Sequence, residues 1–276
     1  MKNRRSKIAA FFDLDGTLVP LPSLEQRFFR VLRERGEIPL KNYFSWLCEA
    51  VRLLPCGTDT AAHANKMYLE DVLSFDQGGR QNGTTPPVEN GGRASERSAS
   101  RDEGQPSAPP SGNPRWTVPR FFEKGLERVA WHGQQGHAIV VVSGTLEPLA
   151  ANAARALEGE LRTRGVAEKV RVCATKLEEM DGRWTGRILG EAMFGRAKAR
   201  AVRALGEEIR LDLSQCWAYG DSAADRWLLA AVGNPVAVNP APPLRRMAGN
   251  RGWPILRMTT RPQEMQPGLL RAERWA

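Results

Sequence analysis

The chain has 276 residues, of which 41% are hydrophobic and 26% are charged, the balance expected of a folded globular protein. No apolar run approaches the roughly 20 residues that a membrane-spanning helix needs, so we predict no membrane span. The apolar run after the basic start of the chain is too short for a secretory signal, and we therefore expect a cytoplasmic protein.

The net charge of +9 suits three kinds of partner: nucleic acid, an anionic membrane surface or an anionic substrate. The lysines and arginines are spread along helical stretches with no aromatic pattern between them, so we predict no nucleic-acid binding. The cysteines and histidines show no metal-ligand spacing, and we expect the thiols to be free and buried. The cysteines are Cys48, Cys56, Cys173 and Cys216.

Residues 7–12 form a continuous apolar run, which is typical of a parallel strand covered on both faces. Asp13 and Asp15 follow where that strand ends, and Gly16 provides a turn directly after them. Side chains at i and i+2 of a strand point the same way, so both carboxylates can face one small space. They repel each other unless a cation compensates them, and hard oxygen ligands suit Mg²⁺. The alternative interpretation is a solvated acidic turn.

Helices without a strand between them are predicted after the acidic turn. Ser23 and Gln26 fit a capping box, which starts a helix that ends by Gly36. Further helices are predicted over residues 40–54 and 60–75. A segment with helices and no second strand indicates a small helical module inserted after the first strand.

The composition changes sharply over residues 76–115. Gly, Pro, Ser, Asn, Gln and charged residues dominate there, and Val88 is the only large aliphatic residue. Such a segment buries too little apolar surface to offset its chain entropy, so we predict a disordered insertion.

From residue 121 onward, helical and strand patterns alternate. Helices are predicted over residues 121–131, 148–164 and 195–206. Strands are predicted over residues 137–142, 170–174, 216–219, 236–238 and 254–256. Asp181-Gly182 predicts a hairpin turn between Leu177 and Ile188. Strands that alternate with helices predict an α/β fold with an open parallel sheet and right-handed crossovers.

Polar residues cluster at the ends of three predicted strands. Ligands bind at the carboxyl ends of the strands in such sheets, so these clusters predict an active site. The clusters are Asp13 with Asp15, Ser143 to Thr145, and Asp221 to Asp225.

In this order along the chain, the clusters resemble the signatures of the haloacid dehalogenase superfamily of phosphohydrolases. The first is Asp13-Leu14-Asp15-Gly16-Thr17, the second Val142-Ser143-Gly144, the third Lys198, and the fourth Gly220-Asp221 with Asp225. The helical module between the first two signatures is similar in position to the cap of subfamily IB, the phosphoserine phosphatase-like branch.

The resemblance implies a doubly wound parallel sheet, a Rossmann-like core with strand order 3-2-1-4-5, and a small helical cap inserted after strand 1. It assigns residues 1–20 and 119–276 to the core, and residues 21–75, with adjoining residues to about 130, to the cap. The insertion over residues 76–115 would lie within or beside the cap.

The resemblance also implies catalytic roles. Asp13 would be the nucleophile that forms an aspartyl-phosphate, and Asp15 would protonate the leaving alcohol and then deprotonate the water. The Ser143 hydroxyl and the backbone N–H groups near Gly144 would bind phosphoryl oxygens, and Lys198 would supply a cation. The alternative for Lys198 is a solvated helix lysine.

Mg²⁺ is the implied cofactor. The resemblance places it on Asp13, the backbone carbonyl of Asp15 and Asp221, while Asp225 acts through a water or by orienting the signature lysine. The alternative role for Asp221 is a helix N-cap, although Ser222 or Asp225 could cap the helix instead.

The cap is expected to select the substrate, because the core contacts only a phosphoryl group. Glu25 lies near the position where phosphoserine phosphatases carry a carboxylate for the substrate amine, or it is a first-turn glutamate favoured by the helix dipole. His63 and Lys66, together with Asn65, form a polar group that faces either the cleft or solvent. Ala224 stands where this branch usually has Asn, which weakens any claim to phosphoserine as the substrate.

These patterns together predict an enzyme, a Mg²⁺-dependent phosphomonoester hydrolase that acts on a small phosphorylated metabolite. Two alternatives on the same scaffold are a phosphotransferase and a non-catalytic protein that binds a partner. The sequence carries no indication of the oligomeric state.

Overall fold

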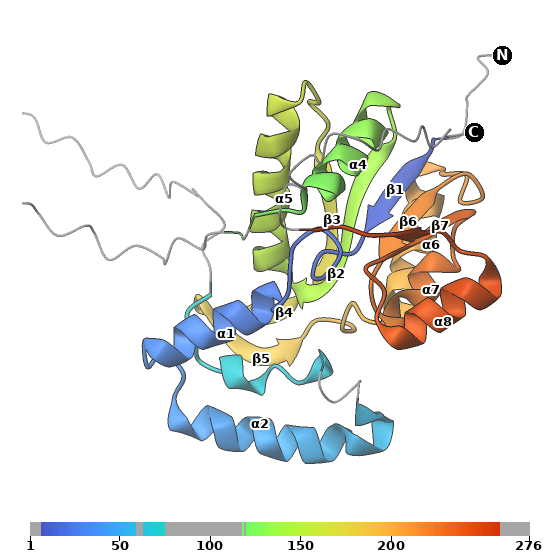
Figure 1. Ribbon diagram of the computed structural model, residues 1–276. Coiled ribbons are helices and arrows are strands. Elements are labelled where there is room, and N and C mark those ends of the chain that lie inside the picture. The colour runs from blue at the N-terminus through green and yellow to red at the C-terminus, as the bar shows by residue number, and fades with distance from the viewer. Residues whose placement is uncertain (1–6, 59–62, 75–117, 119, 260–276) are drawn as a thin grey trace, which may run out of the picture.

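The computed structural model describes residues 7–58, 63–74, 118 and 120–259, and its centre is a six-stranded parallel sheet (Figure 1). The strand order β3-β2-β1-β6-β7-β8 confirms the predicted order 3-2-1-4-5 and adds one strand beside the fifth. The strands are β1 (Ala9–Phe12), β2 (Ala138–Leu146), β3 (Val170–Thr175), β6 (Trp217–Gly220), β7 (Asn234–Val238) and β8 (Ile255–Leu256).

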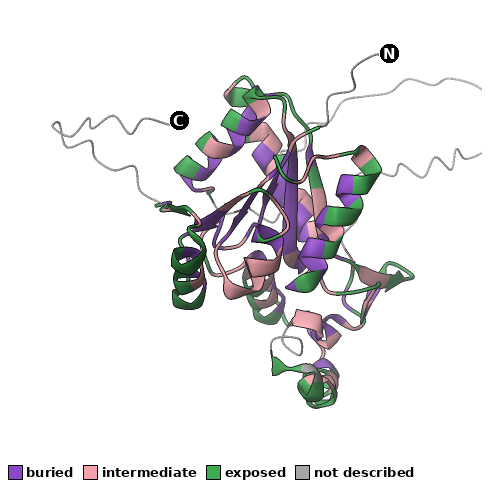
Figure 2. Cartoon of the chain, turned by 90° about the vertical axis from the view of Figure 1, so that its right-hand side faces the viewer, coloured by how far each residue is buried: buried purple, intermediate pink, exposed green. Residues whose placement is uncertain are grey.

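Side chains of β1 alternate between two separate hydrophobic clusters, one on each face of the sheet. Ala10 and Phe12 pack into one cluster, whereas Ala9 and Phe11 pack into the other. The helices of the first cluster are α4 (Glu123–Gln134) and α5 (Glu147–Thr163). Those of the second are α6 (Arg196–Ile209), α7 (Arg226–Leu229) and α8 (Pro242–Arg251). Figure 2 shows the resulting layers, with buried central strands between helices that expose their outer faces.

Helix α8 is absent from the predicted elements. It begins at two consecutive prolines. Proline is favourable in the first turn of a helix, but two consecutive prolines in a sequence indicate a loop. Only Leu244 and Ala248 are buried along its length. Its amphipathic pattern is therefore too weak to predict a helix.

A buried polar network ties α4 to the strand β6. His132 Nε2 lies 2.9 Å from the Tyr219 hydroxyl oxygen, and His132 Nδ1 lies 2.8 Å from His137 Nδ1. Burial lowers the pKa of His132 to about 3, so the imidazole is neutral. The Tyr219 ring also stacks on Phe12 at 4.5 Å between centroids. The network therefore holds β6 against β1 next to the point where both strands end.

The cap segment comprises the described residues 21–58 and 63–74. The predicted capping box is confirmed: Ser23 caps α1 (Leu24–Glu34), and its partner in the box is Gln26. The predicted second helix is also confirmed as α2 (Leu40–Leu53).

The predicted third helix over residues 60–75 ends earlier than predicted, because residues 63–64 are α-helical and the rest of its described part is not. The chain leaves the helical conformation at residue 65 and forms only the short 3₁₀ helix η2 (Met67–Leu69). Residues 71–74 then run alongside a hairpin formed by β4 (Leu177–Met180) and β5 (Arg183–Ile188). Hydrogen bonds to the hairpin replace the helical ones in this stretch.

The hairpin turn at Asp181-Gly182 is confirmed, with positive φ at both residues. Backbone hydrogen bonds attach the hairpin to the cap segment, for example from Trp184 N to Val72 O at 2.9 Å. The Trp184 side chain is buried and meets the Phe28 ring of α1 edge-on at 5.8 Å. A segment more than 100 residues later in the sequence therefore completes the core of the cap segment.

Three further expectations have different outcomes. Cys216 is buried as predicted, but Cys48, which lies in α2, is exposed. No helix in the described ranges has the length and apolar character needed to cross a membrane. The predicted insertion over residues 76–115 lies outside the described residues, and the domain boundaries stay a prediction.

Replacing Trp184 with Ala should destabilise the protein. The substitution leaves a cavity under the cap segment, and large-to-small changes of this kind cost about 3–5 kcal/mol. We expect a lower midpoint in urea denaturation. Trp131→Ala is the control, because Trp131 is 37% exposed and should cost less. Equal midpoints for the two variants would contradict the role given to Trp184.

Candidate active site

Three strands of the sheet bring their polar residues to one edge. Asp13 follows β1, and its backbone N–H donates to the carbonyl of Tyr219 in β6 at 2.9 Å. Ser143 lies in β2, where the register with β3 shifts between Ser143 and Leu146. Asp221 follows β6 directly. The sheet therefore assembles the first, second and fourth predicted signatures at the carboxyl ends of its strands.

The acidic residues of the first and fourth signatures converge, as the sequence predicts. Carboxylate oxygens of Asp13, Asp221 and Asp225 lie within 4.8 Å of one another. Asp13 and Asp225 are buried, and Asp221 is half-buried.

Lys198 links two of these carboxylates. Its ammonium nitrogen lies 2.6 Å from Asp13 Oδ1 and 2.7 Å from Asp225 Oδ1, and the side chain is 5% exposed. The alternative of a solvated helix lysine is therefore wrong. The other oxygen of Asp225 accepts hydrogen bonds from the backbone N–H and the hydroxyl of Ser222 at 3.0 and 2.8 Å. Since Ser222 caps the helical turn that follows, Asp221 is not used as an N-cap.

The charges at this site do not balance. Three carboxylates face a single ammonium group, so burial and mutual repulsion favour protonated carboxyl groups. Burial, Asp13 and Asp225 together raise the pKa of Asp221 to about 8. Burial also raises the pKa of Asp13 to about 7, although Lys198 opposes this shift. Burial disfavours the charged form of Lys198, but the two carboxylates outweigh it and hold the pKa of the ammonium above its ordinary value.

The site fits a hard divalent cation. Asp13 and Asp221 offer carboxylate oxygens close together, and their raised pKa values report negative charge that the described side chains leave uncompensated. Mg²⁺ prefers one or two carboxylates together with waters and phosphate oxygens. Asp225 differs from the other two, because both of its oxygens are already engaged by Lys198 and Ser222. Asp225 is therefore suited to orient Lys198, not to bind the cation directly.

The sequence indicates that Gly16 forms a turn, and the structure shows a second reason for glycine at this position. Its φ of +84° favours glycine, and a Cβ at this position would lie 2.2 Å from Asp221 Oδ2. The turn after β1 can therefore approach Asp221 only without a side chain. Sequence analysis could identify the turn but not its neighbour, which lies about 200 residues away.

The Asp15 side chain is oriented by the start of α1. Its Oδ1 accepts a hydrogen bond from the Leu24 N–H at 2.8 Å, the first residue of that helix. Burial raises the pKa of Asp15 to about 6, against the lowering effect of this hydrogen bond. A carboxyl group with a pKa near neutral can both donate and accept a proton, as a general acid and base must.

Ser143 and Gly144 lie in the last part of β2. Ser143 Oγ accepts a hydrogen bond from the Thr145 N–H at 3.2 Å, which leaves the hydroxyl proton of Ser143 available to a ligand. The Gly144 carbonyl accepts from Thr175 Oγ1 at 2.8 Å. The hydroxyl of Thr145 is buried and has no hydrogen-bond partner among the residues that the structure describes. The sequence analysis included Thr145 in the cluster of residues 143–145 but assigned no role to its hydroxyl.

The residues predicted for substrate selection separate into two groups. Glu25 is in the first turn of α1, where its carboxylate accepts hydrogen bonds from Lys66 Nζ and from the Tyr68 hydroxyl, the latter at 2.7 Å. Lys66 is buried, so this pair is internal to the cap segment. His63 lies elsewhere: its ring stacks on Phe194 at 3.7 Å between centroids, beside Gly144.

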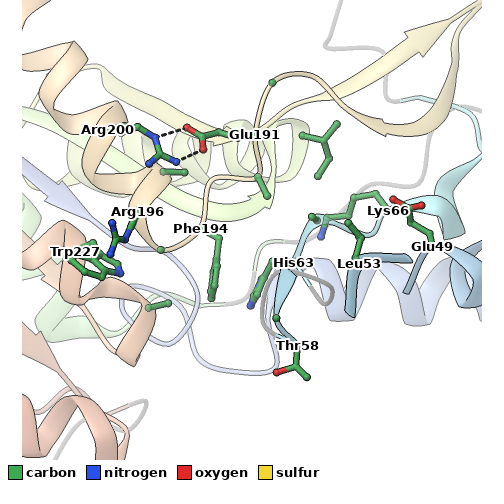
Figure 3. Close-up of a pocket in the computed structure, with 18 of the residues that line it drawn as sticks. Glu49, Leu53, Thr58, His63, Lys66, Glu191, Phe194, Arg196, Arg200 and Trp227 are labelled. Carbon is green, nitrogen blue, oxygen red and sulfur yellow. Dashed lines mark hydrogen bonds and ion pairs between the residues drawn. The ribbon is translucent and has the colours of Figure 1, made fainter. Parts of the chain in front are cut away.

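A pocket of about 1090 Å³ lies between the cap segment and the core (Figure 3), and its lining includes Ala223 and Ala224, which lie between Asp221 and Asp225 in the sequence. Its walls include His63 and Lys66 from the cap segment, and Ala224 from the fourth signature. The sequence analysis did not predict the arginines of its lining. They are Arg52, Arg187, Arg196, Arg200 and Arg226.

Residues 103–230 match the haloacid dehalogenase-like hydrolase family. This match agrees with the family inferred from the signatures, although the matched range covers less than half of the chain and begins after Asp13 and Asp15. A Mycobacterium tuberculosis protein named phosphoserine phosphatase SerB1 is 40% identical over 138 residues, which cover 49% of this chain and 41% of that protein. The chain thus spans less than half the length of this curated relative.

Solved structures agree on the fold of the haloacid dehalogenase-like domain and its cap segment. A Bordetella pertussis Tohama I protein of unknown function has a TM-score of 0.59 at 24% identity, covering 91% of this chain and 98% of that one. A phosphoserine phosphatase in a phospho-aspartyl intermediate analogue form has a TM-score of 0.51 at 16% identity, covering 91% and 93%. At these identities the similarity establishes the fold alone.

The raised pKa of Asp221 predicts a pH-dependent stability. Below the unfolded pKa of about 3.9 this carboxyl group stabilises the folded state, and the contribution is lost as pH rises through about 8. With a chelator present, Asp221→Asn should gain stability relative to wild type between about pH 5 and about pH 8.5. We expect a gain on the order of 1–3 kcal/mol, measured by urea denaturation.

Asp181→Asn, in the exposed hairpin turn, is the control and should follow the wild-type profile. If Asp221→Asn also follows that profile, then Asp221 is not destabilised by its neighbours.

Proposed function

We propose that the chain is a Mg²⁺-dependent phosphomonoester hydrolase that acts on a small phosphorylated metabolite through an aspartyl-phosphate on Asp13. The observation that carries the proposal is the position of the Asp13 carboxylate. It lies at the end of the central strand, bound to Lys198 and within 4.8 Å of carboxylate oxygens of Asp221. The name of the mycobacterial relative supports the same class of reaction.

In the first step, an oxygen of Asp13 forms a bond to phosphorus as the bond from phosphorus to the leaving oxygen breaks. Asp15 gives its proton to the leaving alcohol. In the second step a water attacks phosphorus, Asp15 takes a proton from it, and the bond from phosphorus to Asp13 breaks to release phosphate. The raised pKa of Asp15, about 6, suits both proton transfers near neutral pH.

Donors fixed in place before the reaction stabilise the charge on the phosphoryl oxygens. Lys198 supplies a cation, which Asp225 and Ser222 hold in one position through hydrogen bonds. The Ser143 hydroxyl supplies a neutral donor. Bound Mg²⁺ would be held by Asp13, Asp221 and the Asp15 carbonyl, and it would compensate the excess negative charge of the site.

Specific residues favour a hydrolase over the two alternatives, a phosphotransferase and a non-catalytic binding protein. An acid–base group beside the nucleophile, such as Asp15, activates water and so shortens the life of a phosphoenzyme, whereas a transferase must exclude water. A non-catalytic binding protein would have no need to bury an acidic cluster of uncompensated charge, which costs stability.

The proposal is tested with p-nitrophenyl phosphate in the presence of Mg²⁺. We expect turnover that EDTA removes, no turnover in Asp13→Asn, and a loss of about 10²–10⁴-fold in Asp15→Asn, the usual contribution of general acid–base catalysis. Asp181→Asn makes the same chemical change at an exposed turn and should retain wild-type turnover. Turnover in Asp13→Asn equal to that of wild type would refute the proposal.

A further inference from the structure

In the pocket between the cap segment and the core, the carboxylates are paired with cations, whereas three of the arginines have no carboxylate partner among the described residues. Both carboxylates of the pocket lining already have a cationic partner, and so does Glu25, which binds the lining residue Lys66. The pairs are Glu25 with Lys66, Glu49 with Arg52, and Glu191 with Arg200. The last two are bidentate, a geometry that occupies both carboxylate oxygens.

Three guanidinium groups of the pocket have no such partner. In the described part of the chain, no carboxylate lies within 4.0 Å of the side-chain nitrogens of Arg187, Arg196 or Arg226. Arg196 and Arg226 instead lie against the Trp227 ring, with guanidinium carbons 4.3 and 4.9 Å from its centroid (Figure 3). The ring restricts both side chains without neutralising them.

These arginines are connected to the reacting groups through the chain. Arg196 precedes Lys198 by two residues on α6, and Arg226 directly follows Asp225. Arg187 comes from the other side of the pocket, on the hairpin that is attached to the cap segment. A ligand that places a phosphoryl group at Asp13 would therefore extend toward guanidinium groups from both walls.

We propose that this pocket binds a second anionic group of the substrate, either a carboxylate or a phosphate. The inference rests on the proposed hydrolase function and narrows its substrate class to phosphomonoesters with a second negative charge. An amino group is not recognised, because both carboxylates of the pocket lining, Glu49 and Glu191, are already paired with arginines. The stacked rings of His63 and Phe194 form a wall for the part of the substrate between the two charges.

Three-carbon phosphomonoesters test the proposal, because 3-phosphoglycerate and glycerol 3-phosphate differ only in a carboxylate against a hydroxymethyl group. We expect kcat/KM for 3-phosphoglycerate to exceed that for glycerol 3-phosphate at least tenfold, mainly through KM. O-Phosphoserine, in which an ammonium group replaces the C2 hydroxyl of 3-phosphoglycerate, should be no better than 3-phosphoglycerate. Propane-1,3-diol bisphosphate tests whether a second phosphate replaces the carboxylate. The preference for the doubly anionic ester should weaken as salt is raised.

The variant Arg187→Ala/Arg196→Ala should reduce the ratio between 3-phosphoglycerate and glycerol 3-phosphate to within twofold. Arg203→Ala is the matched control, because Arg203 is an exposed arginine of α6 outside the pocket lining, and it should keep the wild-type ratio. Calorimetric titration of 3-phosphoglycerate into Asp13→Asn, with and without the arginine substitutions, measures binding independently of turnover. There the substitutions should weaken affinity at least tenfold.

The possible outcomes separate the two proposals. If wild type hydrolyses none of the esters, p-nitrophenyl phosphate included, the proposed function fails, and the titration alone decides the anion site. If it hydrolyses glycerol 3-phosphate as efficiently as the doubly anionic esters, the function stands and the anion site is refuted. A preference for O-phosphoserine over 3-phosphoglycerate would also refute it, since that preference requires an unpaired carboxylate.

Discussion

The site depends on one buried interaction, the ammonium group of Lys198 held between Asp13 and Asp225. A buried ion is stable only where its partners are fixed, and each partner here is fixed by a different element. β1 holds Asp13, α6 holds the lysine, and the Ser222 cap holds Asp225. Asp221 has no cation of its own among the described residues, so it retains the excess charge. The same arrangement thus neutralises a nucleophile in part and leaves a place for a metal ion.

The cap segment and the hairpin form one structural unit, although they are far apart in the sequence. Trp184 closes the core between α1 and β5, and backbone hydrogen bonds align residues 71–74 with the hairpin. This unit holds His63 and Arg187 opposite the ends of the strands. In the proposed function the core would contact only the phosphoryl group, so the groups that distinguish one ester from another would come mainly from this wall.

The parts of the molecule that follow from local patterns could be predicted from the sequence. Apolar patterns located all six strands of the parallel sheet, while the order of five of them came from the family resemblance. The capping box at Ser23 located the start of α1. The segment after residue 64 could not be predicted, because its backbone pairs with a hairpin whose place in space no local pattern reports. For the same reason, no local pattern could predict the contact between Gly16 and Asp221 or the arginines from separate elements that line one pocket.

Part of the basic charge of the chain lies at the pocket, where it can attract an anionic ligand. An acidic floor built from Asp13, Asp221 and Asp225 repels a phosphate dianion as strongly as it attracts a metal ion. In the proposed function, the unpaired guanidinium groups at the pocket would attract a phosphate dianion that the acidic cluster repels. Arg196 lies two residues before Lys198 on α6, and Arg226 directly follows Asp225, so any change that moves Lys198 or Asp225 also moves these arginines. Attraction of the substrate and its reaction would therefore be coupled through the backbone.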